Sequence, residues 1–184
     1  MQRIHCFAPV ADTNAVVLIL GSMPGKASLA AGQYYAHQRN MFWTIMGELI
    51  GAHPGLSYRN RLKILRSSGI ALWDVLASCI RKTSLDSHIE ISSEVPNDFN
   101  TFFVRHPGII HVFFNGTKAE QSFLKYVRPT LKPAQLQYRR LPSTSPANAG
   151  ISYQQKLLAW RSVIQATRAR QQIPGRECAS TGLQ

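Results

Sequence analysis

Four short apolar runs divide the first 141 residues of the chain. The first three are residues 16–20 (VVLIL), 70–73 (IALW) and 109–114 (IIHVFF). Continuous apolar runs of this length, bounded by glycine and polar residues, predict strands that are buried on both faces. The fourth run, residues 136–141 (LQYRRL), alternates apolar with polar positions and predicts an edge strand.

Helical patterns lie between these strands. After Asn40 the apolar residues recur every three or four positions, which predicts a helix that ends near Gly51. Thr117 and Glu120 have the spacing of a capping box, and they predict a helix that ends near Val127. Alternating strands and helices indicate an α/β protein whose parallel sheet is covered by helices on both faces.

Two further helices are indicated by capping signals. Asn97 is a candidate cap for a short helix that ends before Pro107. Ser152 and Gln155 form another capping box, and the helix that follows carries one apolar stripe, made of Tyr153, Leu157, Trp160 and Ile164.

The length of 184 residues and the hydrophobic fraction of 45% fit one domain with a substantial core. We expect residues 1–169 to form this domain. Residues 170–184 are small and polar, and we expect them to form a disordered tail.

Targeting and metal-binding signals are absent from the sequence. No stretch of about 18 apolar residues occurs, and the N-terminus has no apolar signal core, so we expect a cytoplasmic protein without a membrane partner. Cys6, Cys79 and Cys178 are widely separated, which predicts free thiols and argues against an iron–sulfur cluster or a structural zinc. The six histidines form no HExxH pattern, so the sequence predicts neither a metal nor another cofactor.

The charge points to a polyanionic partner. Lysine and arginine total 21 against 9 acidic residues, which gives a net charge of +12. Such an excess favours nucleic acid as the partner, although a soluble protein can simply be basic.

Unusual residues follow each of the four predicted strands. They are the turn at 21–25 (GSMPG), Asp74, the pair at 115–116 (NG) and the segment at 142–146 (PSTSP). In open parallel sheets, ligands bind outside the carboxyl ends of the strands. We therefore expect these four segments to converge on one edge of the sheet.

Each of these features has a functional interpretation and a purely structural one. Gly21 and Ser22 either present backbone N–H groups to a ligand or form a plain turn. In the segment 34–43 (YYAHQRNMFW), an aromatic ring either stacks on an extruded base or packs in the core. Asn40 in that segment either holds a water molecule or caps the helix after it.

The same alternatives apply to the later strands. Asp74 either accepts a hydrogen bond from a base edge or caps the next segment, and Asn115 either contacts a ligand or forms a turn. Residues 142–146 either press on a duplex and grip phosphates or form a surface loop. Nearby basic residues suggest a phosphate-binding face, made of Lys118, Lys125, Arg128, Lys132, Arg139 and Arg140.

Taken together, the motifs resemble the uracil-DNA glycosylase superfamily, and within it the hypoxanthine-DNA (deoxyinosine) glycosylase branch. The resemblance covers roughly residues 14–165 and rests on six segments in order: LILGSMPG, YYAHQRNMFW, IALWDVLASCIRKTSLDSHI, NDF, VFFNGTKA and LPSTSPANA. It implies a three-layer α/β/α fold around a central four-stranded parallel sheet. It also implies base excision without a metal or cofactor.

The resemblance assigns roles to individual residues. Tyr35 would stack on the flipped base, Asn40 would be the main catalytic residue that positions water, and Asn115 would contact or stabilise the base. Asp74 would read the base edge. The loop that enters DNA would consist of Pro142, Ser143, Thr144, Ser145 and Pro146.

One departure concerns the first motif, whose third residue is Asp or Asn in many relatives. Here it is Met23, which cannot activate water. Asn40 is therefore expected to be the residue that positions the water. Met23 also argues against efficient removal of uracil. Two alternatives stay open: a uracil or thymine mismatch glycosylase and, in a different class, a DNA-binding relative without catalysis, which Met23 favours. A nucleotide-binding α/β protein is a weaker alternative, because GxGxxG and GxxxxGK[ST] are both missing.

The sequence therefore predicts a monomeric, monofunctional glycosylase of the base excision repair type, acting on single- or double-stranded DNA with a deaminated base, most simply hypoxanthine. Because no lysine occupies an evident nucleophile position, we expect no Schiff base. Deamination of adenine turns N1 from an acceptor into an N–H donor. An ionised Asp74 would accept from that group and reject adenine.

Overall fold

A parallel four-stranded sheet forms the centre of the protein. The computed structural model describes residues 3–131 and 135–171. The strand order is β3-β2-β6-β7, and all three pairings are parallel. The strands are β2 (Val17–Gly21), β3 (Ile70–Asp74), β6 (His111–Asn115) and β7 (Gln137–Leu141). The four predicted strands are thus confirmed, and β7 lies at an edge as its alternating pattern indicated.

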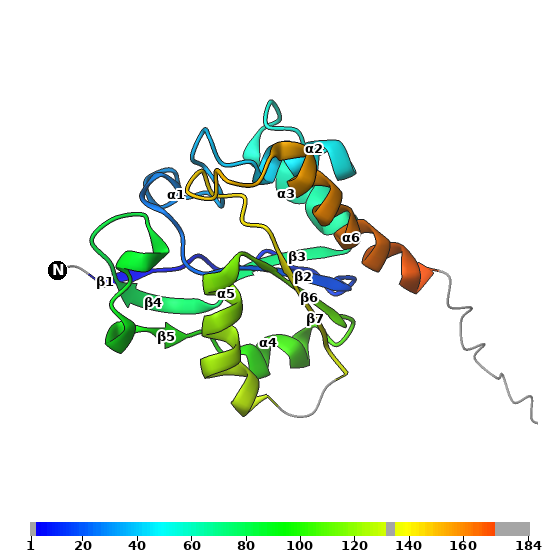
Figure 1. Ribbon diagram of the computed structural model, residues 1–184. Coiled ribbons are helices and arrows are strands. Elements are labelled where there is room, and N and C mark those ends of the chain that lie inside the picture. Colours follow the sequence, from blue (N-terminus) through cyan, green and yellow to red (C-terminus); the bar gives the residue numbers. More distant parts are fainter. Residues whose placement is uncertain (1–2, 132–134, 172–184) are drawn as a thin grey trace, which may run out of the picture.

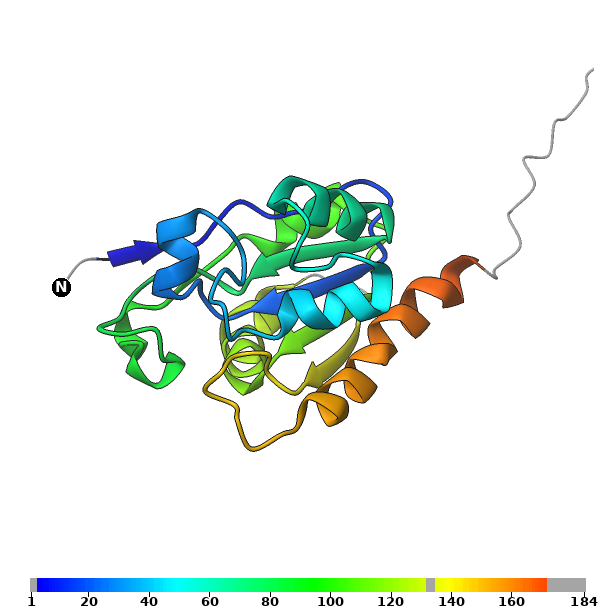
Figure 2. The same cartoon turned by 90° about the horizontal axis from the view of Figure 1, so that it is seen from above.

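Helices cover both faces of this sheet, as Figure 1 shows. One face carries α2 (Phe42–Ile50), α3 (Tyr58–Ser67) and α6 (Tyr153–Gln171), and Figure 2 shows α2 and α6 side by side. The other face carries α4 (Phe99–Arg105) and α5 (Thr117–Ser122), with a π-helical turn at Phe123–Val127. The three-layer α/β/α architecture is therefore confirmed.

The two cores follow from the alternation of side chains along each strand. Ile19 and Leu72 pack with Phe42 and Trp160 in the core beneath α2 and α6. Their neighbours along the strands point to the opposite core, which contains Leu18, Leu20, Ala71, Trp73, Val112 and Phe114. Strands with two buried faces need apolar residues at every position, which explains the continuous runs in the sequence.

A second, antiparallel sheet lies beside the first and was not predicted. It consists of β1 (Arg3–His5), β4 (Leu76–Ile80) and β5 (Val95–Pro96), in the order β1-β4-β5. Short helical turns follow, η1 (Asp86–His88) and η2 (Ile91–Ser93), with η4 (Arg128–Thr130) later in the chain. Strands of two to five residues with mixed burial lack a distinct periodicity, so these elements left no clear pattern.

Two of the three predicted helix caps are corrected. Gly116 is the residue before α5, it has φ of 102°, and no side-chain capping bond forms, so Thr117 is the first helical residue rather than the cap. Asp98 caps α4 by accepting from the Thr101 N–H at 3.0 Å. Asn97 instead donates to the Asp74 carbonyl oxygen at 2.8 Å.

The capping box before α6 is confirmed. The Ser152 hydroxyl accepts from the Gln155 N–H at 3.3 Å, and the Gln155 side chain accepts from the Ser152 N–H at 3.0 Å. The predicted apolar stripe of this helix packs in the core around Trp160. Because α6 continues to Gln171, the first two residues of the predicted tail are helical, and residues 172–184 lie outside the described residues.

The remaining sequence expectations concern cysteines and membranes. Cys6 and Cys79 are free thiols, and Cys178 lies outside the described residues. A short helix, α1 (Lys26–Ala31), follows β2. In the described part of the chain, no helix has both the length and the apolar character needed to cross a bilayer.

Candidate active site

A cavity of about 1100 Å³ opens at the carboxyl edge of the parallel sheet. Three of the four predicted segments line it: residues 22–25, residues 115–116 and the loop 142–146. The volume slightly exceeds the range of about 300–1000 Å³ that is typical of small-molecule pockets.

Tyr35 contributes an aromatic surface to this cavity. Its ring stacks on Phe42, with ring centroids 4.1 Å apart and planes inclined by 24°. Its φ is +54°, which makes it the one non-glycine residue with positive φ among those described. Such a conformation is strained for a bulky residue and persists where packing holds it, often at functional sites. The segment after α1 is therefore turned so that Tyr35 reaches both the core and the cavity.

The Tyr35 hydroxyl is buried beneath the cavity without a hydrogen-bond partner. Burial raises the pKa of Tyr35, and the Asp74 carboxyl group raises it further, while the adjacent Asn115 side chain lowers it. The phenol is therefore neutral and offers a proton donor rather than an anion.

Asn40 lies at the cavity wall, just before α2. The N-cap residue of α2 is Met41 rather than Asn40, but Asn40 Oδ1 accepts from the Phe42 N–H at 3.0 Å and so supports the start of the helix. Its amide nitrogen has no hydrogen-bond partner among the described residues. The Asn40 oxygen thus supports the start of the helix, while its NH₂ group, unpaired within the part of the chain that the structure describes, lies at the cavity wall. The role of Asn40 in holding water stays a prediction.

Asn115 and Thr144 bind each other reciprocally. Asn115 Nδ2 donates to Thr144 Oγ1, and Asn115 Oδ1 accepts from the Thr144 N–H, both at 2.9 Å. Thr144 is completely buried. A Cβ on the neighbouring Gly116 would lie 2.9 Å from the Ser143 Cβ, so glycine is needed for this close approach. The end of β6 is thus joined to the loop after β7.

That loop is also fixed from its other side. The Pro142 carbonyl accepts from the Trp160 indole N–H at 3.0 Å, and the Thr144 carbonyl accepts from the Met41 N–H at 3.0 Å. The buried Lys156 donates to the Asn148 carbonyl at 2.7 Å. Residues 142–146 all line the cavity, so a rigid loop stands beside Asn40 and Asn115.

Asp74 lies behind the cavity rather than in its lining. The residue is 3% exposed, and one carboxyl oxygen has no hydrogen-bond partner. A Cβ at Gly21 would lie 2.5 Å from Asp74 Oδ1 and 3.1 Å from the Tyr35 hydroxyl, so Gly21 makes room for both groups. Burial, with the Asp86 charge in addition, raises the pKa of Asp74 to about 8. This position does not support the hypothesis that an ionised Asp74 reads a base edge.

Sequence reasoning missed Asp86, which enters the cavity from η1. Ser22, which was predicted as a site residue, donates its hydroxyl proton to Asp86 Oδ1 at 2.7 Å. The Arg81 Nη1 lies 3.8 Å from the same oxygen. A single acid in a polar stretch has no characteristic spacing, and only the fold brings residues 22, 81 and 86 together.

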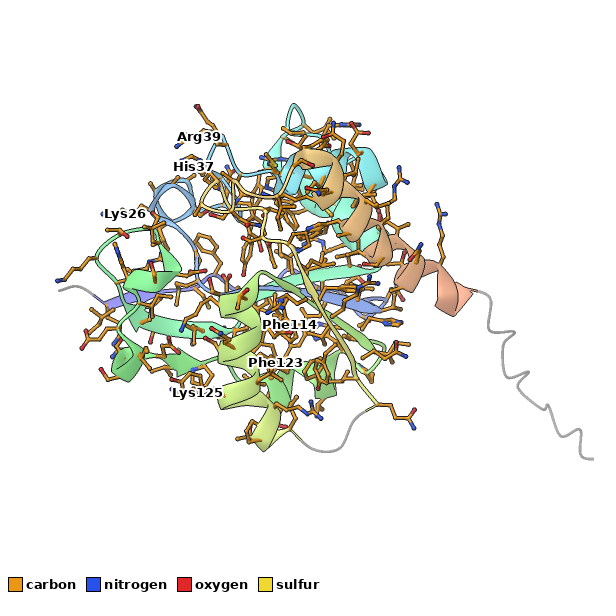
Figure 3. The ribbon with its side chains drawn as sticks, viewed as in Figure 1. Lys26, His37, Arg39, Phe114, Phe123 and Lys125 are labelled. Carbon is orange, nitrogen blue, oxygen red and sulfur yellow. The ribbon has the colours of Figure 1, made fainter. Side chains whose placement is uncertain are left out.

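Two of the basic residues that line the cavity form ion pairs with glutamates. Lys118 pairs with Glu94, and Arg140 pairs with Glu120 at 3.0 Å. Lys26 and Arg39 also line the cavity, and Figure 3 shows them with His37 on α1 and the segment after it. The other members of the predicted basic face lie elsewhere: Lys125 and Arg128 stack on tyrosine rings, Arg139 is on β7, and Lys132 is outside the described residues.

Metal ligands do not gather in this part of the protein. Within residues 3–131 and 135–171, no group of three or more His, Cys, Asp and Glu side chains is arranged to hold a metal ion. The polar atoms of the cavity are instead amides, hydroxyls, basic groups and one carboxylate.

The fold and the cavity define a three-layer α/β/α protein with its site at the carboxyl edge of a parallel sheet. The chain belongs to the uracil DNA glycosylase superfamily, whose family model matches residues 8–164.

Two curated relatives are named hypoxanthine DNA glycosylase. The protein from Methanosarcina barkeri is 36% identical over 143 residues, which cover 77% of this chain and 86% of the relative. The protein from Methanosarcina acetivorans is 36% identical over 147 residues, which cover 79% and 89%. The solution NMR structure of a candidate uracil DNA glycosylase from Methanosarcina acetivorans is also similar. Its TM-score is 0.76 at 32% identity, with coverage of 91% of this chain and 99% of that one.

Proposed function

We propose that the protein is a monofunctional DNA glycosylase that removes hypoxanthine from DNA. The observation that carries this proposal is the shared cavity of Tyr35, Asn40 and the rigid loop 142–146. The two relatives named hypoxanthine DNA glycosylase support the choice of base.

The reaction requires the base to leave the stack. A base inside a duplex is inaccessible, so the nucleotide rotates into the cavity and its base stacks on Tyr35. The loop 142–146 occupies the space near the duplex that the nucleotide leaves. Because this loop is held by Asn115, Trp160 and Met41, it stays in place during extrusion.

Hydrolysis breaks the bond between C1′ of the sugar and N9 of the base. The bonding electrons leave with the base, and positive charge develops on the sugar. A water molecule held by Asn40 adds its oxygen to C1′, and its proton neutralises the departing base. The products are free hypoxanthine and an abasic deoxyribose. Neutral amide groups suit this task because they orient water without adding charge.

Uracil is the second candidate substrate. Uracil also presents a ring N–H, and the cavity of about 1100 Å³ does not exclude a pyrimidine. The similar solution structure of a candidate uracil DNA glycosylase supports this alternative.

A panel of oligonucleotides tests the proposal. Single- and double-stranded DNA carrying hypoxanthine, uracil, xanthine, thymine opposite guanine, or undamaged adenine is incubated with the protein, then treated with alkali to cut abasic sites. We expect hypoxanthine to be cut most rapidly. Fastest cleavage at uracil would transfer the assignment to the second candidate, and salt-dependent binding without abasic product would indicate an inactive DNA-binding relative.

The same panel tests the monofunctional mechanism. Lys26 and Lys118 line the cavity, although Lys118 is paired with Glu94. We expect intact strands before alkali treatment and no covalent adduct in the presence of borohydride. Strand cleavage without alkali would indicate a lysine nucleophile.

The monomeric state and the cytoplasmic location remain predictions.

A further inference from the structure

Asp86 is the one acidic residue in the cavity lining among the residues that the structure describes. Its side chain is 44% exposed, so a ligand in the cavity can reach it. Asp74, the other carboxyl group near the site, is buried behind Gly21. Any ligand group that needs a carboxylate acceptor therefore has Asp86 as its partner.

The surroundings of Asp86 fix one carboxyl oxygen and leave the other open. Oδ1 accepts the Ser22 hydroxyl proton at 2.7 Å and lies 3.8 Å from Arg81 Nη1. The Arg81 side chain is only 1% exposed and is anchored by the Pro24 carbonyl. Oδ2 has no hydrogen-bond partner among the described residues. The carboxylate is thus held in a defined orientation with one free acceptor.

Asp86 and the aromatic surface belong to the same site. A Cβ at Gly21 would lie 3.1 Å from the Tyr35 hydroxyl, and the next residue, Ser22, donates to Asp86, so the end of β2 joins Tyr35 and Asp86 in one cavity lining. Asn40 and Thr144 lie together in another part of the lining, joined by the bond from the Met41 N–H. Ser22, which binds Asp86, follows β2, whereas Thr144 follows β7, two positions away in the strand order β3-β2-β6-β7. A base on Tyr35 can therefore point its sugar toward Asn40 and its far edge toward Asp86.

We propose that Asp86 is a specificity-determining residue whose free carboxyl oxygen accepts a hydrogen bond from the ring N–H of the extruded base. This inference rests on the proposed function. Hypoxanthine carries an N–H at N1, whereas adenine carries a lone pair there. A carboxylate binds the first group and repels the second, so Asp86 separates the deaminated base from its parent.

The test compares wild-type protein with Asp86→Asn on hypoxanthine, adenine and unsubstituted purine, which like adenine lacks the ring N–H. The amide keeps the size of the side chain and can accept from Ser22, but it can also donate to a base. We expect the rate on hypoxanthine to fall about 10- to 100-fold and the hypoxanthine-to-purine rate ratio to shrink. Glu48→Gln removes an exposed carboxylate of α2 that has no ion pair, and this control should leave the ratio unchanged.

Affinity for an abasic duplex separates base reading from a structural role. An abasic site has no ring N–H, so Asp86→Asn should bind it as tightly as the wild type does. If the variant unfolds, Asp86→Glu keeps the charge beside Arg81 while displacing the carboxylate, and it should shrink the rate ratio as well.

The outcomes distinguish this inference from the function it rests on. A wild-type protein that releases no base from any substrate overturns the proposed function, and the role of Asp86 falls with it. A wild-type protein that cuts hypoxanthine, combined with variants whose rate ratios are unchanged, overturns only the role of Asp86. A parallel loss of affinity for abasic DNA also overturns it.

Discussion

At the scale of single residues, the site depends on side chains that serve the fold and face the cavity at once. The oxygen of Asn40 accepts from the Phe42 N–H at the start of α2, and the residue lines the cavity. Tyr35 packs on Phe42 while lining the same cavity. The sequence identified both residues, because each belongs to a dense aromatic and polar motif. It did not identify Asp86, whose hydrogen-bond partner Ser22 is distant in sequence.

Replacing Asn40 should separate its two roles. We expect Asn40→Ala to lower the single-turnover cleavage rate about 100- to 1000-fold, because the water would lose its positioning group. DNA affinity should be retained. The lost hydrogen bond to the Phe42 N–H should also cost about 1 kcal/mol of unfolding free energy. Ser57→Ala removes the cap of α3, away from the cavity, and should reproduce the stability loss without the rate loss. A rate close to that of the wild type would exclude Asn40 from the mechanism.

Asp74 should make stability depend on pH. Its pKa of about 8 in the folded protein lies above its ordinary value of 3.8, so the folded state binds this proton more tightly. The contribution to stability is therefore complete below about pH 4 and is lost as the pH rises through about 8.

Denaturant unfolding at several pH values measures this effect. Asp74→Asn cannot ionise, so between pH 5 and 7 its free energy of unfolding should fall less than that of the wild type, by about 1 kcal/mol per pH unit. Parallel pH profiles for the variant and the wild type would mean that burial does not perturb Asp74. The exposed Glu48→Gln provides a control that should keep the wild-type profile.

At the scale of elements, the parallel sheet was predictable and the connections were less so. Strands buried on both faces require continuous apolar runs, and β2, β3 and β6 have them. The position of the cap before α5 was wrong because the spacing of Thr117 and Glu120 is similar for a cap and for a first turn. Gly116 decides between them, since its φ of 102° turns the chain one residue earlier.

The junction between β6 and the loop after β7 gives a test at this scale. Thr144→Val keeps the side-chain shape but removes the acceptor of the Asn115 amide. We expect a loss of about 1–3 kcal/mol in unfolding free energy and a fall of about 10- to 100-fold in cleavage rate, because the loop would shift.

Thr167→Val is the matched control. Thr167 donates to the Ile164 carbonyl within α6, where no cavity residue is involved. Its substitution should leave cleavage unchanged. If both variants cleaved equally well, the junction would not position the site.

At the scale of the whole molecule, charge and topology act together. A net charge of +12 favours association with a polyanion, whereas the carboxyl edge of the sheet carries the cavity. The sequence predicted this edge because parallel strands of one sheet end on the same side. It did not predict the volume of the cavity, which depends on how α1, η1 and the loop after β7 are spaced around it. The short strands of the antiparallel sheet have no clear sequence periodicity. The position of η1, which carries Asp86 into the cavity, was therefore not predicted.

Release of free base from DNA is the direct test of whether the protein is a hypoxanthine DNA glycosylase. A duplex with a single hypoxanthine is incubated with excess protein, and the low-molecular-weight products and the strand are analysed by mass spectrometry. We expect one equivalent of free hypoxanthine and an uncut strand that carries one abasic deoxyribose. DNA that is bound but retains its hypoxanthine would contradict this function.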